Sequence, residues 1–150
     1  LDRFLLRLSI GYPSPAEELE LLKRRQYGGG MDGVCQVVSR EQLRLLREEA
    51  GRVHVSEAVL QYIVQLVNAT RNHPQLMQGA SPRAALAVMS VSRAVAFLRG
   101  RDYVIPEDVQ CIWTDAIAHR LLLAPGLSDA ASPQSISAET LHNTPAPKVQ

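Results

Sequence analysis

Long apolar runs and a net charge of either sign are both missing from this sequence. The formal net charge is +1 at pH 7, so no overall electrostatic attraction to nucleic acid or to an anionic membrane is expected. No apolar run approaches the roughly 18 residues that a membrane-spanning helix needs. No signal peptide is recognisable at the start of the sequence. We therefore expect a cytoplasmic protein with neither a membrane span nor a nucleic-acid partner.

The sequence contains only two cysteines, Cys35 and Cys111, which are far apart and form no metal-ligand pair. Lone cysteines in a chain without a secretion signal are expected to stay reduced. The histidines are equally dispersed, since no two of them have the i, i+4 spacing of helical metal ligands. We therefore expect no metal site. No local Ser–His–Asp arrangement supports a freestanding hydrolytic enzyme.

The sequence also lacks the loop G-x-x-x-x-G-K-[ST], whose backbone N–H groups hold nucleotide phosphates. The glycines at 28–30 are not followed by the lysine of that loop and have no strand–helix context. Residues 27–34 are therefore interpreted as a glycine-rich loop whose role stays open. We expect this stretch of chain, taken alone, to hold no nucleotide and to catalyse no nucleotide hydrolysis.

Residues 14–124 carry the signals of a helical domain, and 150 residues that are 46% hydrophobic suffice for one core. Ser14 and Ser39 each begin a capping box, in which a serine is followed three residues later by Glu or Gln. Ser56 precedes an apolar stripe of helical period that Pro74 ends. Each serine therefore predicts the start of a helix.

Two further helices are predicted after Pro74. Residues 82–99 are apolar almost all round, which is typical of a central buried helix, so Met89 is interpreted as a core residue. Pro106 opens the last predicted helix, with Glu107 and Asp108 in its first turn. The fold class that follows is all-α: a bundle of about five helices in which short loops join antiparallel neighbours.

The two ends of the chain have different patterns from the bundle. Apolar and polar residues alternate with a period near two between Phe4 and Ile10, which predicts a strand within residues 1–13. Its partners would belong to a sheet that this chain does not contain. Residues 125–150 are rich in proline and serine and poor in large apolar side chains, which predicts a disordered tail.

The run from Gly79 to Ala84, with Ser81, Pro82 and Arg83 at its centre, is the most informative motif. Serine is a favoured N-cap, whose hydroxyl accepts a first-turn N–H, and proline suits the first helical position. An arginine beside a helix N-terminus opposes the helix dipole but can bind phosphate with its planar fork. A solvated arginine at an ordinary helix start explains the pattern equally well.

Several motifs, in order, resemble the MoxR type of AAA+ ATPase. The run 79–84 resembles the second-sensor motif of that family, and Leu1-Asp2-Arg3-Phe4 resembles the segment where its ATPase core ends. The neighbouring motifs match as well: Ala69-Thr70-Arg71, His73-Pro74, Gly100-Arg101-Asp102-Tyr103-Val104, Pro106-Glu107-Asp108-Val109 and His119-Arg120-Leu121. Together they span residues 1 to about 123.

The resemblance implies that residues 14–124 are the C-terminal lid domain of a longer protein and that residues 1–13 are the end of its ATPase core. It implies a chaperone-like, homo-oligomeric ring that hydrolyses ATP with Mg²⁺ and remodels an unknown client protein. Arg83 would contact the ATP phosphates, and Arg3 would reach the nucleotide of the neighbouring subunit as a catalytic arginine finger. Without the resemblance, a surface ion pair with Asp2 is the simpler reading of Arg3.

A helical interaction or DNA-binding module without nucleotide function is the alternative. A helix–turn–helix reader needs a recognition helix with basic and polar residues facing outward. The predicted helix after Ser81 is too apolar for that role, and the other helices have no stripe of arginine and lysine. The nucleotide-related interpretation is therefore the one that the residues favour.

Overall fold

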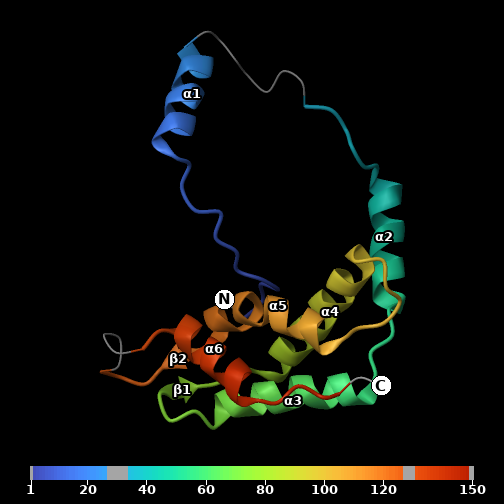
Figure 1. Ribbon diagram of the computed structural model, residues 1–150, viewed down its shortest axis with the longest axis vertical. Helices are drawn as coiled ribbons and strands as arrows, with labels where there is room; N and C mark the ends of the chain where they lie inside the picture. The colour runs from blue at the N-terminus through green and yellow to red at the C-terminus, as the bar shows by residue number, and fades with distance from the viewer. Residues whose placement is uncertain (1, 27–33, 127–130, 149–150) are drawn as a thin grey trace.

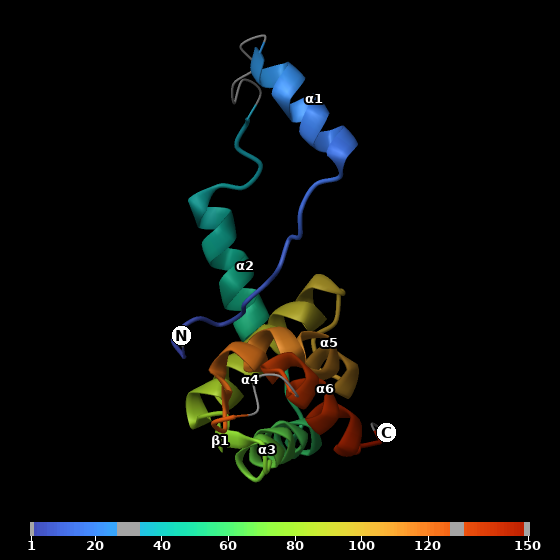
Figure 2. The same cartoon turned by 90° about the vertical axis from the view of Figure 1, so that its left-hand side faces the viewer.

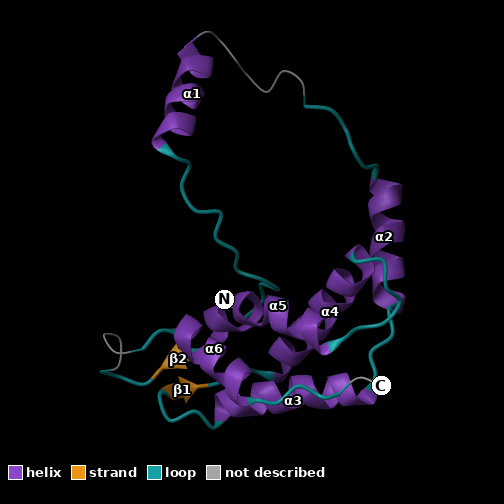
Figure 3. Cartoon of the chain, viewed as in Figure 1, coloured by secondary structure: helices purple, strands orange, loops and turns teal. Residues whose placement is uncertain are grey.

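The computed structural model describes residues 2–26, 34–126 and 131–148. Its helices and strands are these: α1 (Pro15–Gln26), α2 (Arg40–Arg52), α3 (Glu57–Arg71), β1 (Leu76–Gln78), α4 (Pro82–Leu98), α5 (Pro106–Ile117), the 3-10 helix η1 (Ala118–Arg120), β2 (Leu122–Leu123) and α6 (Pro133–Asn143). Figure 3 shows how little of this is strand. The predicted all-α class is confirmed. Most of the glycine-rich loop, residues 27–33, lies outside the described residues.

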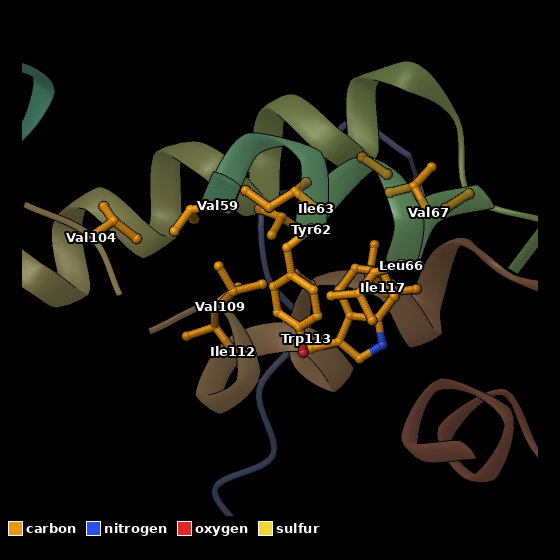
Figure 4. Close-up of a cluster of buried hydrophobic side chains, with 14 of the residues drawn as sticks. Val59, Tyr62, Ile63, Leu66, Val67, Val104, Val109, Ile112, Trp113 and Ile117 are labelled. Atoms are coloured by element: carbon orange, nitrogen blue, oxygen red, sulfur yellow. The ribbon is translucent and has the colours of Figure 1, made fainter. Parts of the chain in front are cut away.

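The hydrophobic core lies where α3, α4, α5 and α6 meet. Its largest fully buried side chains are Trp113 and Ile117 on α5 and Tyr62 and Leu66 on α3. These side chains point toward one another between the two helices (Figure 4). The apolar residues of α3 recur at helical spacing, so one face is buried and the opposite face is left to solvent.

Helix α4 packs closely on its neighbours because its buried face consists mainly of small residues: Ala84, Ala87, Val88, Ser92 and Ala96. Small side chains let helix backbones approach, and α4 makes extensive contact with α5. The expectation of burial all round is wrong, since Leu86 and Leu98 are 62% and 83% exposed. Met89 is partly buried against the core, as predicted.

The predicted helix starts are confirmed by their capping bonds. Ser39 and Gln42 form a complete capping box at α2, and the Ser56 hydroxyl accepts the Val59 N–H at α3. Helix α2 continues through Gly51 to Arg52, so the prediction that this glycine ends the helix is wrong. A glycine inside a helix is costly but tolerated.

Two short strands that the sequence did not indicate close one end of the bundle. Leu76 pairs with Leu123 in an antiparallel register, and the Ala124 N–H donates to the Gln75 carbonyl. The strands follow α3 and η1, so they connect the end of α3 to the end of the α5–η1 segment. Their brevity explains why no alternating pattern predicted them.

Helix α1 stands away from the bundle in both views (Figures 1 and 2). Every residue of α1 is exposed, including Leu19, Leu21 and Leu22. Helix α2 rises from the bundle and touches α4 only along part of its length, so Leu43 and Leu46 are also exposed. The predicted 14–124 domain is therefore a compact bundle from about residue 53 onward, preceded by two projecting helices.

The strand predicted over Phe4–Ile10 is wrong for this structure. Residues 4–10 form no helix or strand, and the Arg7 N–H donates to the carbonyl of Asp115 on α5 at 2.9 Å. The alternation of apolar residues predicts a strand only where a partner strand is present to pair with it. Here the segment runs along the end of the helical bundle instead.

The disordered tail predicted for residues 125–150 is wrong over α6. The side chains of Ile136, Ser137 and Thr140 are buried, and Ile136 is part of the core. The Ser132 hydroxyl caps the helix by accepting the Ser135 N–H at 3.0 Å. One apolar residue that fills a gap between α3 and α5 is enough to dock a short helix, which a composition argument misses. Residues 127–130 and 149–150 of that tail lie outside the described residues.

Candidate functional site

The second-sensor motif is fastened to the end of α3. The Ala80 N–H donates to the Thr70 hydroxyl at 3.0 Å, and the Arg71 Nε donates to the Ala80 carbonyl at 2.8 Å. A Cβ atom on Gly79 would stand 2.6 Å from the backbone of Arg71, so only glycine fits there. The motifs 69–71 and 79–84 are therefore one structural unit.

Ser81 occupies the N-cap position of α4 but does not act as expected. Its backbone is extended, and Pro82 takes the first helical position, yet the serine hydroxyl makes no capping bond. Instead the hydroxyl donates to the carboxylate of Asp2, at 3.1 and 3.2 Å from its two oxygens. The first-turn N–H groups of α4 are thus left without a side-chain cap, which favours an anion there.

Arg83 lies in this uncapped first turn, and its side chain is exposed. Within the described part of the chain, the hydrogen bonds and ion pairs give Arg83 no partner. No carboxylate therefore competes for its guanidinium. The structure agrees with both earlier readings of Arg83, because a solvated arginine and an arginine that awaits a phosphate look alike without the ligand.

Arg120 holds the opposite side of this site. Its side chain is only 2% exposed and pairs with the Asp2 carboxylate at 2.7 Å. The same guanidinium donates to three backbone carbonyls: those of Asp2, Phe4 and Ala116. His119 also contacts the Phe4 carbonyl, with 3.1 Å between its Nε2 and that oxygen. The motif 119–121 therefore fixes residues 2–4 against the bundle.

Arg3 is the exposed residue between these two fixed neighbours. The simpler reading of Arg3, an ion pair with Asp2, is not found, because Asp2 pairs with Arg120 and Ser81 instead. The described residues supply Arg3 with no other carboxylate. Asp2 thus links the segment that carries Arg3 to the helix start that carries Arg83.

The remaining motif pair, 100–104 and 106–109, forms a buried ion cluster away from this site. The Asp108 side chain is fully buried and receives two hydrogen bonds from Arg101, at 2.6 and 2.7 Å, and one from Arg99 at 2.8 Å. Burial opposes the charge of Asp108, but the hydrogen bonds from Arg101 and from the Ile105 N–H outweigh it and lower the pKa of this carboxyl. Its role is to fix the loop before α5.

A mainly apolar groove of about 450 Å³ runs between α3 and α4. Leu60, Val64 and Leu86 line it, and Arg71 and Pro82 also belong to its lining. This groove explains why the outward face of α4 is apolar and yet exposed. It begins beside the uncapped helix start.

Sequence reasoning found Arg3 and Arg83 but missed the residues that hold them. Asp2 and Arg120 are 118 positions apart, so no local spacing could reveal their contact. The serine was placed correctly at the N-cap, while its bond to Asp2 was missed for the same reason. Only the presence of both residues in motifs of one family gave an indirect signal.

Comparisons with known proteins agree with this architecture. A family model of the AAA lid domain matches residues 68–140, so the match ends inside α6. The chaperone MoxR1 of Mycobacterium tuberculosis is 39% identical over 158 residues, which cover 99% of this chain and 41% of that protein. The uncharacterised protein YeaC of Bacillus subtilis is 38% identical, over 83% of this chain and 39% of that protein.

A crystal structure of a candidate ATPase from Cytophaga hutchinsonii superposes on this chain with a TM-score of 0.87. The two are 30% identical, and the match covers 98% of this chain and 48% of that one. Fold and matches together define an AAA lid domain, the helical portion of an AAA+ ATPase. The chain belongs to the MoxR-type family of these proteins. It spans about two fifths of the length of the curated relatives that it matches. Among the described residues, no helix is long and apolar enough to cross a membrane.

Proposed function

We propose that this chain is the C-terminal lid of a ring-forming AAA+ ATPase and that Arg83 contacts the phosphates of ATP. The observation that carries this proposal is the start of α4, where an exposed guanidinium stands beside N–H groups that no side chain caps. Such a helix start favours an anion, and a planar guanidinium binds phosphate oxygens two at a time. The charge of Asp2 is compensated by Arg120, so it does not oppose the phosphates.

Arg3 is proposed to reach the nucleotide of the neighbouring subunit. Its side chain is exposed, while the residues on either side of it are held by Arg120. A guanidinium placed at the γ-phosphate stabilises the charge that spreads over the equatorial oxygens, an effect of about 10³–10⁵ in rate in GTPases. Because Arg3 would act across a subunit boundary, hydrolysis would depend on the homo-oligomeric ring.

ATP with Mg²⁺ is the proposed cofactor of the full-length protein, and the bound metal would neutralise phosphate charge. The residues present fit the phosphate part of this cofactor, because Arg83 supplies charge and α4 supplies free N–H donors. We assign no Mg²⁺ ligand to this chain, since the carboxylate at the site, Asp2, is engaged by Ser81 and Arg120. The chain's own part is to bind and orient the phosphates.

The work of the assembled protein is proposed to be the remodelling of client proteins in the cytoplasm. The support is the printed description of one relative, MoxR1, as a chaperone. The described residues carry no basic stripe of the kind that the alternative, a DNA-binding module, requires.

The test is carried out with full-length protein and a fluorescent ATP analogue. Arg83→Ala is expected to weaken nucleotide binding, whereas Arg3→Ala is expected to leave binding intact and slow hydrolysis. Arg47→Ala, which removes an exposed arginine of α2, is the matched control and should behave as the wild type. Mixing Arg3→Ala subunits with wild-type subunits should lower the rate in proportion to the fraction of mixed interfaces. Unchanged binding and hydrolysis in both site variants would refute the proposal.

A further inference from the structure

We propose that Asp2 is a positioning residue, which ties the segment that carries Arg3 to the start of α4, so that the two arginines move as one unit with the lid. This inference rests on the proposed function of Arg3 and adds a mechanism by which the lid controls it. Its basis is the contact of one carboxylate with two distant parts of the bundle. The Asp2 carboxylate accepts from Ser81 of α4 and from Arg120 of η1.

The contacts form a chain without a flexible member. Arg120 is held by the Ala116 carbonyl of its own helix at 2.9 Å and donates to Asp2 through both carboxylate and backbone. Ser81 is held in turn because Ala80 is bonded to Thr70 and Arg71 of α3. The position of residues 2–4 is therefore determined by α3, α4 and η1 together.

The charges make Asp2 the member that cannot be replaced without consequence. The Arg120 guanidinium is almost fully buried, and Asp2 is the only carboxylate that the ion pairs of the described residues assign to it. An asparagine at position 2 keeps the size of the side chain but removes the counter-charge. Placing Arg3 wrongly by even 1 Å can cost up to about 10²-fold in rate, because a catalytic group must lie within a narrow range of the reacting atoms.

A coupling through Asp2 has a direct consequence for the reaction. When a nucleotide bound at Arg83 shifts the lid, the bond from Ser81 to Asp2 carries the shift to Arg3. The occupancy of one site would then determine whether the arginine finger of that subunit is placed at the next site. A lid without this link could still bind nucleotide but would not report it.

The physical link is tested first on this chain, by spin labels at exposed positions 4 and 86. Cys35 and Cys111 are replaced by serine, and the labels are attached at Phe4→Cys and Leu86→Cys. A narrow distance distribution is expected with Asp2 present and a broad one with Asp2→Asn or Ser81→Ala. Asp102→Asn, which changes an exposed aspartate elsewhere, is the matched control and should leave the distribution narrow. A distribution that stays narrow in both site variants would overturn the proposal.

The functional coupling is tested by the hydrolysis rate of the full-length protein. Asp2→Asn is expected to lower kcat by about tenfold or more with little change in KM, because the contact acts on the placement of a group in the reaction step. In an Arg3→Ala background the same change should have no further effect on kcat. A general structural defect would instead lower the rate in both backgrounds, and this result would overturn the proposal.

The same assays distinguish failure of this inference from failure of the proposed function. If Arg3→Ala and Arg83→Ala both leave nucleotide binding and hydrolysis unchanged, the proposed function is wrong, and this inference falls with it. If those variants are impaired while Asp2→Asn hydrolyses ATP at the wild-type rate, the proposed function stands and only the coupling through Asp2 is refuted.

Discussion

The indole N–H of Trp113 donates to the backbone carbonyl of Ser137 at 2.9 Å, which joins α5 to α6 in the centre of the protein. Trp113 is fully buried, so its N–H would be left without a partner if α6 were removed. An unpaired buried donor costs about 1–3 kcal/mol. Helix α6 is therefore an integral part of the lid.

Removing α6 should destabilise the lid strongly. Ile136→Ala, which leaves the helix in place, is expected to lower the free energy of unfolding by about 2–5 kcal/mol, because it creates a cavity in the core. Urea denaturation followed by circular dichroism measures this change. His142→Ala, at an exposed position on the same helix, should change stability by less than about 0.5 kcal/mol. Equal stability of Ile136→Ala and wild type would mean that α6 does not dock.

Gly79→Ala should destabilise the lid because the new Cβ would collide with the backbone of Arg71. Overpacking of this kind costs about 1–3 kcal/mol, and thermal melting measures it. Gly51→Ala is the matched control, since nothing lies within 4 Å of the added Cβ there and Gly51 is inside a helix. That control is expected to gain up to about 1 kcal/mol of stability. A tolerated Gly79→Ala would contradict the close approach of α3 and α4.

Asp108 should make the stability of the lid depend on pH. Its folded-state pKa is lowered, so its contribution is fully present above the unfolded pKa of about 3.9 and is lost as the pH falls through the folded value. Denaturation curves at pH values from 6 down to 3 should show that loss in the wild type. Asp108→Asn should show a smaller loss over the same range.

At neutral pH, Asp108→Asn is expected to cost about 3 kcal/mol, at the lower end for a broken buried pair. The lower end applies because the Arg99 side chain is 49% exposed and water partly compensates for its lost partner. Asp102→Asn is the control for the loss of a surface aspartate. An Asp108→Asn protein as stable as the wild type would contradict the assigned ion cluster.

The sequence predicted most of what local chemistry decides. Ser39, Ser56 and Pro106 each marked a helix start to within one residue, because capping and proline geometry depend on near neighbours. It failed where a distant partner decides. The segment from Phe4 to Ile10 reads as a strand but runs beside α5, and α6 is ordered by the pocket that receives Ile136.

The candidate site divides in the same way. Arg83 could be placed at the start of a helix from Ser81 and Pro82 alone. The bond that takes the Ser81 hydroxyl away from capping and gives it to Asp2 joins positions 79 residues apart. No pattern in a single sequence contains that separation, so the residues that fix Arg3 had to come from the structure.

The most direct test of the central claim is the ATP hydrolysis rate of full-length protein carrying Arg83→Ala or Arg83→Lys. Both variants should melt near the wild-type temperature, because the exposed side chain leaves no cavity when it is removed. Arg83→Ala is expected to lower kcat/KM, and Arg83→Lys to restore it only in part, since an ammonium cannot reproduce a bidentate guanidinium contact. Hydrolysis at the wild-type rate by the lysine variant would contradict the bidentate phosphate contact, and a wild-type rate in the alanine variant would contradict any phosphate role for Arg83.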